Sequence, residues 1–340
     1  MLHDAIILGH GLAGAVLAEV LQQRGLSIHV FNERRNGNAS LVAAGVVNPI
    51  VFKRDIPSWR AGELLPIADG FYTDLQARYG IDLWHPLPMV KVFPTPIERD
   101  QWERVMQDTE SSSFITQRPE VDVDQAPVGV PHGYGTVTKA AWLDVPLVLA
   151  AQRAKLIGDG RLTERNVQEE EIVNEQDHIR IGDVRARWLI RCSGPFSTAQ
   201  GLAPVKGETL LVRIPGLGFK NMVHRRVFIL PLGDDVYRIG STFDWTNVWT
   251  GTTTNAREEL LGMLQAFVKL SIEVLEHSSG VRPATKDRRP IVGRTGEHEA
   301  IFNGLGSRGV LLAPWCAMHL ADHLFDGKEI DPEVRCDRFS

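Results

Sequence analysis

The segment Ala5-Ile6-Ile7-Leu8-Gly9-His10-Gly11-Leu12-Ala13-Gly14, at the start of a 340-residue chain, decides the fold. Its leading apolar residues predict a buried parallel strand, because such strands are covered on both faces. Three glycines follow with the spacing G-x-G-x-x-G, and the residues after them have helical periodicity as far as Gly25. A second apolar run, at 27–31, predicts another strand. Strand, glycine turn, helix and strand in this order predict a dinucleotide-binding unit.

Each glycine of the turn has a physical role in such a unit. Gly9 permits the tight turn, Gly11 lets the backbone approach a pyrophosphate, and Gly14 lets the helix pack closely on the strand. The free N–H groups and the positive end of the helix then face the phosphates. An acidic residue is expected about 20 residues further on, to bind ribose hydroxyls. Asn32 stands near that place and Glu33 follows, so both are candidates.

Composition limits the class of protein. The chain is 43% hydrophobic and 23% charged, which is typical of a globular protein of one large or two smaller domains. A net charge of −5 gives no general reason to expect nucleic-acid or membrane binding. Three cysteines without metal-site spacing, and no apolar run long enough to span a membrane, predict a cytoplasmic protein without a bound metal.

Two further segments of the sequence are informative beside the glycine turn. Residues 38–49 are small, apolar and poor in charge, and they follow the glycine turn by about thirty residues. Residues 300–314 read as a strand that runs through Gly306-Ser307-Arg308-Gly309 into a helix. With the N-terminal turn, these segments resemble the FAD-dependent D-amino acid oxidase-like family. That family includes glycine oxidase, sarcosine oxidase and the oxidoreductase domain of the bifunctional tRNA 5-methylaminomethyl-2-thiouridine enzyme.

The resemblance implies an α/β fold with two domains. A discontinuous Rossmann-like FAD-binding domain is expected from residues 1–55, 141–205 and 279–340. A second α+β domain, with an antiparallel sheet that covers the flavin, is expected from residues 56–140 and 206–278 and would bind the substrate. Strands at 209–214, 227–231 and 236–242 would belong to that sheet.

The resemblance also implies non-covalent FAD and oxidation of a small amino acid or secondary amine. Arg282 matches the position that holds the substrate carboxylate, which suits a fixed guanidinium fork. Arg308 is the second candidate for substrate binding. The expected cofactor-binding residues come from five segments: Gly9, Gly11, Leu12, Ala13, Gly14; Asn32, Glu33; Ser40, Ala43, Ala44, Gly45; Val167, Cys192, Ser193, Gly194; and Gly306, Ser307, Arg308, Gly309, Val310, Leu311.

Three alternatives remain open at this stage. One is oxidation of a carboxymethylaminomethyl group on a tRNA wobble uridine, which Gly306–Gly309 favours and the acidic net charge disfavours. Another is a nicotinamide-dependent dehydrogenase, and the third is a dinucleotide-binding protein without catalytic activity. A small-molecule substrate is the expected partner, and the sequence does not indicate the oligomeric state.

Several other residues are weaker candidates for the site. Lys286, Arg288 and Arg289 would make the substrate anionic at more than one place if they lined the mouth of the site. Aromatic side chains in the same half of the chain fit a wall of the substrate pocket or the core equally well: Phe243, Trp245, Trp249, Tyr237 and His224.

Overall fold

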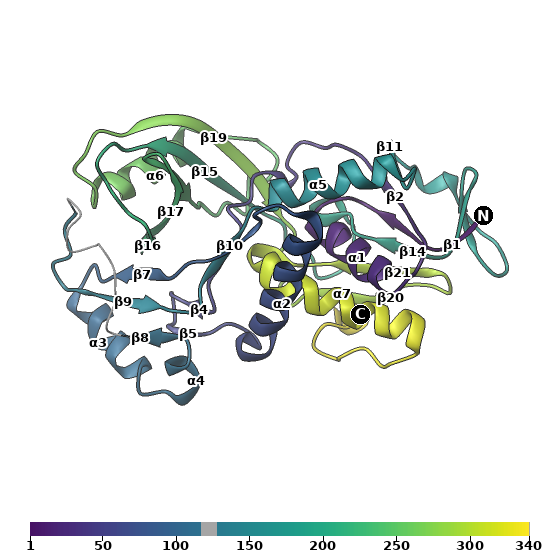
Figure 1. Ribbon diagram of the computed structural model, residues 1–340, viewed down its shortest axis with the longest axis horizontal. Helices are drawn as coiled ribbons and strands as arrows, with labels where there is room; N and C mark the ends of the chain where they lie inside the picture. Colours follow the sequence, from purple (N-terminus) through teal and green to yellow (C-terminus); the bar gives the residue numbers. More distant parts are fainter. Residues whose placement is uncertain (117–127, 340) are drawn as a thin grey trace.

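The computed structural model describes residues 1–116 and 128–339. Residues 117–127 of the predicted substrate domain, and Ser340, lie outside the described residues. Two eight-stranded sheets occupy the two ends of an elongated molecule (Figure 1). The N-terminus lies at the end that contains β1 (Leu2–Leu8), and the C label lies in the same half of the molecule but nearer its middle, beside α7.

The first sheet has a parallel core built from the beginning, middle and end of the chain. Its parallel strands lie in the order β11 (Leu162–Glu164), β2 (Ile28–Asn32), β1, β14 (Val184–Arg191) and β21 (Glu299–Asn303). Antiparallel additions are β12 (Ile172–Asn174), β13 (Ile179–Ile181) and β20 (Ile291–Arg294). The predicted Rossmann-like α/β class is confirmed, whereas the division into two domains stays a prediction.

Helices α1 (Leu12–Gln23), α5 (Val145–Gly158) and α7 (Gly309–Asp326) pack on this sheet, and α2 (Ala61–Tyr79) packs outside α7. Helix α1 packs against α7 and α5, and α2 packs against α7. Gly14 explains how the turn and the helix fit together, since a Cβ there would lie 1.9 Å from the carbonyl oxygen of Gly9. Only glycine permits that close approach.

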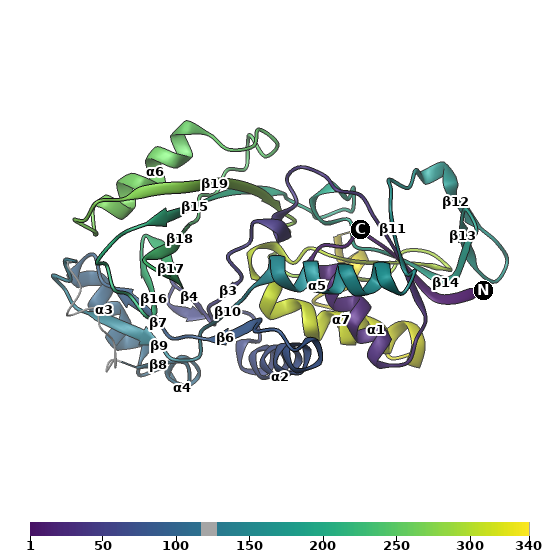
Figure 2. The same cartoon turned by 45° about the horizontal axis from the view of Figure 1, so that its top comes forward.

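The second sheet is antiparallel at every pair but one. Its order is β19 (Glu273–Arg282), β15 (Val205–Arg213), β18 (Val236–Gly240), β17 (Val227–Gly233), β16 (Met222–Arg225), β7 (Met89–Val92), β9 (Tyr134–Val137) and β8 (Ile115–Thr116), with β16 and β7 parallel. The antiparallel sheet predicted from residues 209–242 is therefore confirmed. Figure 2 shows β15 and β19 extending from this sheet toward the other end of the molecule.

Smaller elements complete the described chain. A three-stranded sheet holds β3 (Val46–Val47), β10 (Ala141–Leu143) and β6 (Trp84–Pro86), and a two-stranded one holds β4 (Ile50–Val51) and β5 (Ile56–Pro57). The other helices are α3 (Pro96–Val105), α4 (Thr109–Ser112) and α6 (Thr254–Gln265), with 3₁₀ turns η1 (Ala39–Leu41), η3 (Glu169–Glu171), η4 (Gly194–Phe196), η5 (Gly306–Arg308) and η6 (Cys336–Phe339). Among the described residues, no helix combines the length and the apolarity that crossing a bilayer requires.

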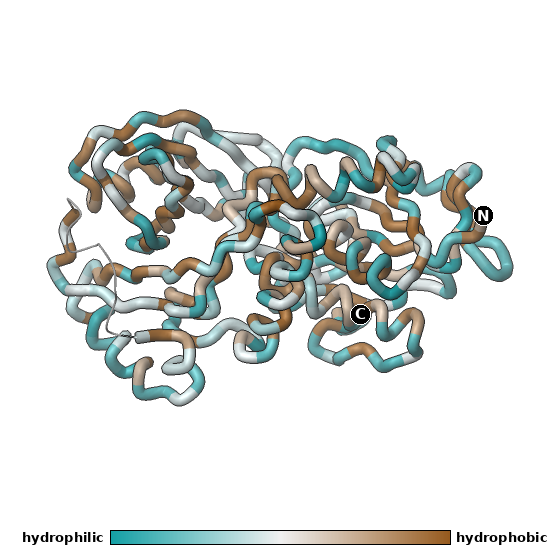
Figure 3. The backbone as a smooth tube through the Cα atoms, in the orientation of Figure 1, coloured by the Kyte–Doolittle hydropathy of each residue, from teal (hydrophilic) through white to brown (hydrophobic). Residues whose placement is uncertain are grey.

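Apolar segments gather between the helices and the sheets, and polar segments occupy the outer turns (Figure 3). One charged group is nevertheless buried among the helices. Glu19 is 1% exposed on α1 and accepts hydrogen bonds from Arg78 Nη1 (2.7 Å), Tyr79 Oη (2.5 Å) and Gln152 Nε2 (2.8 Å). These partners lie on α2 and α5, so the carboxylate joins three helices. Burial, together with hydrogen bonding to Glu19, raises the pKa of the Tyr79 hydroxyl, which keeps it a donor at neutral pH.

We expect Glu19→Ala to lower the free energy of unfolding by about 2 kcal/mol, because it leaves the buried Gln152 amide and the partly buried Tyr79 hydroxyl without their acceptor and breaks the ion pair with the more exposed Arg78. Urea denaturation of the purified protein measures this change. The matched control is Glu63→Ala, which breaks an exposed pair with Arg60 and is expected to cost less than about 1 kcal/mol. Equal effects of the two substitutions would show that Glu19 does not join the helices.

Candidate active site

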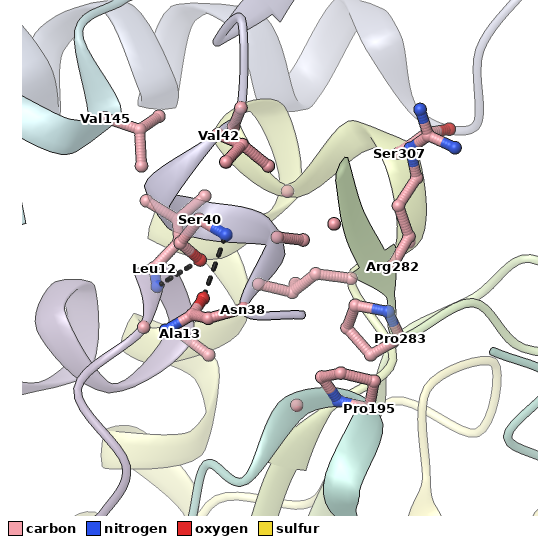
Figure 4. Close-up of a pocket in the computed structure, with 18 of the residues that line it drawn as sticks. Leu12, Ala13, Asn38, Ser40, Val42, Val145, Pro195, Arg282, Pro283 and Ser307 are labelled. Atoms are coloured by element: carbon pink, nitrogen blue, oxygen red, sulfur yellow. Dashed lines mark hydrogen bonds between the residues drawn. The ribbon is translucent and has the colours of Figure 1, made fainter. Parts of the chain in front are cut away.

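One cavity of about 620 Å³ runs between the glycine turn and the second sheet. Its lining includes residues from the start of α1, from η1, from the ends of β14 and β19, and from η5 and α7. In Figure 4, Leu12, Asn38 and Ser40 lie on one side of this space, and Arg282, Pro283 and Pro195 lie on the opposite side. The volume is within the range of small-molecule and cofactor sites.

Side chains from neighbouring segments hold the glycine turn in place. The Leu12 N–H donates to Ser40 Oγ (3.0 Å), and the His10 N–H donates to Asn32 Oδ1 (2.9 Å). The Ser40 N–H in turn donates to Asn38 Oδ1 at 3.0 Å (Figure 4). Gly11, the N-cap residue of α1, has no side chain that could cap the helix, and it lines the cavity together with Leu12 and Ala13. The positive end of this helix therefore faces the cavity, which suits an anionic ligand.

Two glycines of the turn differ in what surrounds them. A Cβ on Gly9 would lie 2.6 Å from the Cys192 carbonyl oxygen, and its φ of +105° also favours glycine. A Cβ on Gly11 meets no backbone closer than 4 Å, and its nearest neighbour is Ser40 Oγ at 3.2 Å. Gly11 also lines the cavity, so a side chain there would press on Ser40 Oγ, the acceptor of the Leu12 N–H, at the cavity wall.

Arg282 lies at the end of β19, on the far side of the cavity. It donates from Nη1 to the Thr242 carbonyl (3.3 Å) and from Nη2 to Ser241 Oγ (2.8 Å). Gly207 lies beneath it, since a Cβ there would lie 2.0 Å from Arg282 Nη2. Burial lowers the pKa of Arg282 to about 10, so the guanidinium stays protonated at neutral pH. No carboxylate of the described residues pairs with it.

Arg308 precedes α7 and is the second unpaired cation of the cavity wall. Burial, and to a lesser degree Arg288, lowers its pKa to about 10, which still leaves it charged. Its Nη1 and the Oγ1 of Thr209 are both buried without a hydrogen-bond partner in the described part of the chain. Both residues line the cavity. Buried polar atoms without partners are costly, so these atoms indicate a ligand with acceptor groups.

The wall beside the second sheet is mostly apolar. Phe52, Met89, Phe228 and His224 line it. Burial, with the nearby charge of Lys91, lowers the pKa of His224 to about 4, so its imidazole is neutral at pH 7. Lys91 lies behind this wall, where its ammonium is 2.5 Å from Asp55 Oδ1. The cavity therefore has a cationic part and an uncharged part.

The structure brings nearly all the predicted site residues to this one cavity. Both arginines line it, together with Gly9, Gly11, Leu12, Ala13, Asn32, Glu33, Ser40, Ala43, Ala44, Gly45, Val167, Cys192, Ser193, Gly194, Gly306, Ser307, Gly309 and Val310. Gly14 and Leu311 do not line it. Gly14 instead permits the close packing of α1, and Leu311 is 2% exposed in the core. Their predicted contact with the cofactor stays a prediction.

The weaker candidates separate into two groups. Phe243 and His224 line the cavity, Tyr237 is a buried core residue, and Trp245 and Trp249 are exposed residues outside the lining. Lys286, Arg288 and Arg289 are absent from the lining, and the Arg289 guanidinium stacks on Trp59 at 5.0 Å. Other lining residues were not predicted from the sequence, among them Asn38, Thr209, Phe228 and Ser241. They come from segments that meet only in the folded chain, so local sequence gives no signal for them.

Comparison with known proteins identifies the family of this chain. The model of the family described as "FAD dependent oxidoreductase" matches residues 4–323. The chain belongs to this family. It is therefore an FAD-dependent oxidoreductase, and the predicted cofactor is confirmed. This finding removes the nicotinamide-dependent alternative.

Individual relatives are distant but extend over most of the chain. Glycine oxidase of Bacillus subtilis is 24% identical and matches over 97% of this chain and 95% of its own length. The bifunctional protein MnmC of Marinobacter nauticus is 23% identical over 94% of this chain, which spans about 55% of that protein. The crystal structure of glycine oxidase from Geobacillus kaustophilus has a TM-score of 0.79, with 19% identity and coverage of 99% and 98% of the two chains.

The residues present fit FAD. The start of α1 at Gly11, which lines the cavity, suits a pyrophosphate. Asn32 and Glu33 line the same part of the cavity and offer acceptors for hydroxyl groups. The start of α7, whose N-cap residue makes no side-chain cap, provides a second positive helix end at the cavity, close to Leu12 of α1.

Proposed function

We propose that this FAD-dependent oxidoreductase oxidises a small amino acid or a secondary amine that carries a carboxylate. The observation that supports it is Arg282, a half-buried cation in the cavity wall without a carboxylate partner in the described chain. A ligand that supplies the opposite charge and excludes water there would pair with it favourably. The planar guanidinium matches a carboxylate with two parallel hydrogen bonds.

When bound, FAD supplies a hydride acceptor for such an amine, and the protein supplies orientation and a controlled environment. Arg282 would hold the carboxylate and so fix the direction in which the substrate lies. The uncharged wall of Phe52, Met89 and Phe228 would exclude water from the amine. Desolvation disfavours the ammonium form and favours the neutral amine, which is the form that can release a hydride from the adjacent carbon.

The positive groups at the start of α7 suit the negative charge that develops on the cofactor in this reaction. Gly309 and Val310 begin an uncapped helix at the cavity, and Arg308 adds a full positive charge beside them. Such fixed positive groups stabilise negative charge that accumulates on the cofactor. We infer that Arg308 has this role or binds a second anionic group of the substrate.

Anaerobic mixing of the FAD-loaded protein with candidate amines tests the proposal. We expect N-methyl or D-amino acids that fit the cavity to remove the flavin absorbance, and the decarboxylated counterpart of each reactive compound to leave it unchanged. Sarcosine and dimethylamine are one such matched pair. Equal reduction by the amines without a carboxylate would contradict the proposal. Persistent oxidised flavin with every amine would favour the non-catalytic alternative.

A second candidate is oxidation of a carboxymethylaminomethyl group on a tRNA wobble uridine. The match to the tRNA 5-methylaminomethyl-2-thiouridine biosynthesis protein MnmC over 94% of this chain favours it. This function requires binding of tRNA. Contacts to the phosphates release counterions, so the affinity for tRNA should fall as the salt concentration rises. Filter binding of tRNA at two salt concentrations distinguishes the two functions.

A further inference from the structure

We propose that Phe243 and Trp245 form a stacking surface at the opening of the cavity, which binds a planar aromatic ring of the substrate. This inference rests on the proposed function, because it places the substrate carboxylate on Arg282. It narrows the substrate class to amines that carry a carboxylate at one end and an aromatic or heteroaromatic ring at the other.

The two side chains are large, exposed and adjacent. Phe243 is 51% exposed and Trp245 is 64% exposed, and their rings stack with centroids 5.9 Å apart and planes 21° apart. Single exposed apolar residues need no explanation, but two stacked aromatic rings beside a cavity indicate a binding surface. Phe243 also lines the cavity, and a residue that does so while half exposed lies at its opening.

The backbone explains why both rings share one face. Asp244 exchanges two backbone hydrogen bonds with Lys206, of 2.9 and 3.0 Å, so the segment is extended there. Side chains at i and i+2 of an extended segment point to the same face. Asp244 points the other way, and its Oδ2 lies 3.7 Å from the buried Lys206 ammonium.

Buried charges beneath the segment hold it in this position. Glu208 is fully buried and accepts hydrogen bonds from the Thr253 N–H (2.8 Å) and hydroxyl (2.9 Å). The ammonium of Lys206, 1% exposed, donates to Thr250 Oγ1 at 2.8 Å. Because these contacts fix residues 244–253 onto β15, the aromatic surface is ordered before a ligand arrives, which lowers the entropic cost of binding.

The surface is continuous with the proposed carboxylate site. The Arg282 guanidinium carbon lies 4.6 Å from the centre of the Phe243 ring, so Phe243 contacts Arg282 as well as Trp245. A substrate that extends from Arg282 toward the opening therefore passes along these rings. A substrate as small as glycine would leave Trp245 uncovered, whereas a ring on the other amine substituent would stack on it.

Binding of two unreactive carboxylates to the FAD-loaded protein tests the inference by calorimetry. Phenoxyacetate and methoxyacetate both carry the carboxylate, and only the first has a ring. We expect phenoxyacetate to bind about tenfold more tightly, as one favourable aromatic stack implies. Trp245→Ala should reduce this ratio to below about threefold, while Trp245→Phe should retain most of it.

The control is Ile97→Ala, which removes an exposed apolar side chain of α3 and should leave the ratio unchanged. Equal affinity of the two carboxylates for the unaltered protein, or a ratio that survives Trp245→Ala, would overturn the inference. So would a change of oligomeric state in Trp245→Ala with the ratio intact, since a second copy would then cover the surface. If neither carboxylate binds, the proposed function itself fails.

The ring could belong to a free amine or to a base within RNA, and the reductive reaction distinguishes them. The probes are N-benzylglycine against sarcosine, and an anticodon stem-loop carrying 5-carboxymethylaminomethyluridine against the free nucleoside. Faster flavin reduction by N-benzylglycine assigns the ring to a small amine, and faster, salt-sensitive reduction by the stem-loop assigns it to RNA. In either case the preference must fall in Trp245→Ala, and an unchanged preference would overturn the inference.

Discussion

Replacing Arg282 with methionine is expected to lower kcat/KM for a carboxylate-bearing amine by about a thousandfold. Removing one partner of a buried, hydrogen-bonded charge pair costs about 2–5 kcal/mol, and each 1.4 kcal/mol is a factor of ten. Methionine retains most of the apolar volume of the side chain while it removes the charge. Steady-state kinetics, with the amine that reduces the flavin fastest, measures the change.

Two further variants separate the charge of Arg282 from its geometry. Arg282→Lys keeps the charge but loses the planar fork, so it should restore only a small part of the activity. Gly207→Ala would place a methyl group 2.0 Å from Arg282 Nη2 and should displace the guanidinium. All three variants should retain the flavin. A loss of less than tenfold in Arg282→Met would show that another group binds the carboxylate.

Replacing Gly11 with valine is expected to weaken FAD binding by at least about a hundredfold without unfolding the protein. The new side chain would occupy cavity space beside Ser40, where the backbone is expected to approach the pyrophosphate. Its φ of −89° is one that valine adopts without strain. Fluorescence titration of the apoprotein with FAD measures the affinity, and circular dichroism reports the fold.

The comparison variants are Gly14→Ala and Gly62→Ala. A methyl group on Gly14 would lie 1.9 Å from the Gly9 carbonyl oxygen, so this variant should lose stability as well as FAD. A methyl group on Gly62 in α2 meets nothing within 4 Å, so this variant should bind FAD normally. Stoichiometric FAD in purified Gly11→Val would contradict the assignment of the turn to the cofactor.

Local patterns in the sequence were sufficient for the elements around the glycine turn. Consecutive apolar residues predicted β1, the spacing of the glycines predicted the turn, and helical periodicity predicted α1 close to its observed bounds. These elements form from neighbouring residues, so a short window contains the information. The antiparallel sheet was predicted from a resemblance, because the order of its strands depends on contacts between distant segments.

The sequence did not predict which charged side chains are buried, because their partners come from distant segments of the chain. Lys206 and Glu208 look like the polar start of a strand, yet both are almost fully buried under the loop that carries Phe243 and Trp245. Arg191 is unexpected at the end of a buried strand. Its structural partners are Glu169 and Glu299, which pair with it at 2.7 and 2.9 Å. Each partner is more than twenty residues away in the chain.

The central prediction is that a single FAD lies in the cavity between the glycine turn of α1 and the start of α7. A crystal structure of the FAD-loaded protein with methoxyacetate tests it most directly. We predict the pyrophosphate at Gly9–Gly14, the flavin between that turn and Gly306–Val310, and the carboxylate on Arg282. Electron density for FAD away from Gly11, or for methoxyacetate away from Arg282, would contradict the account.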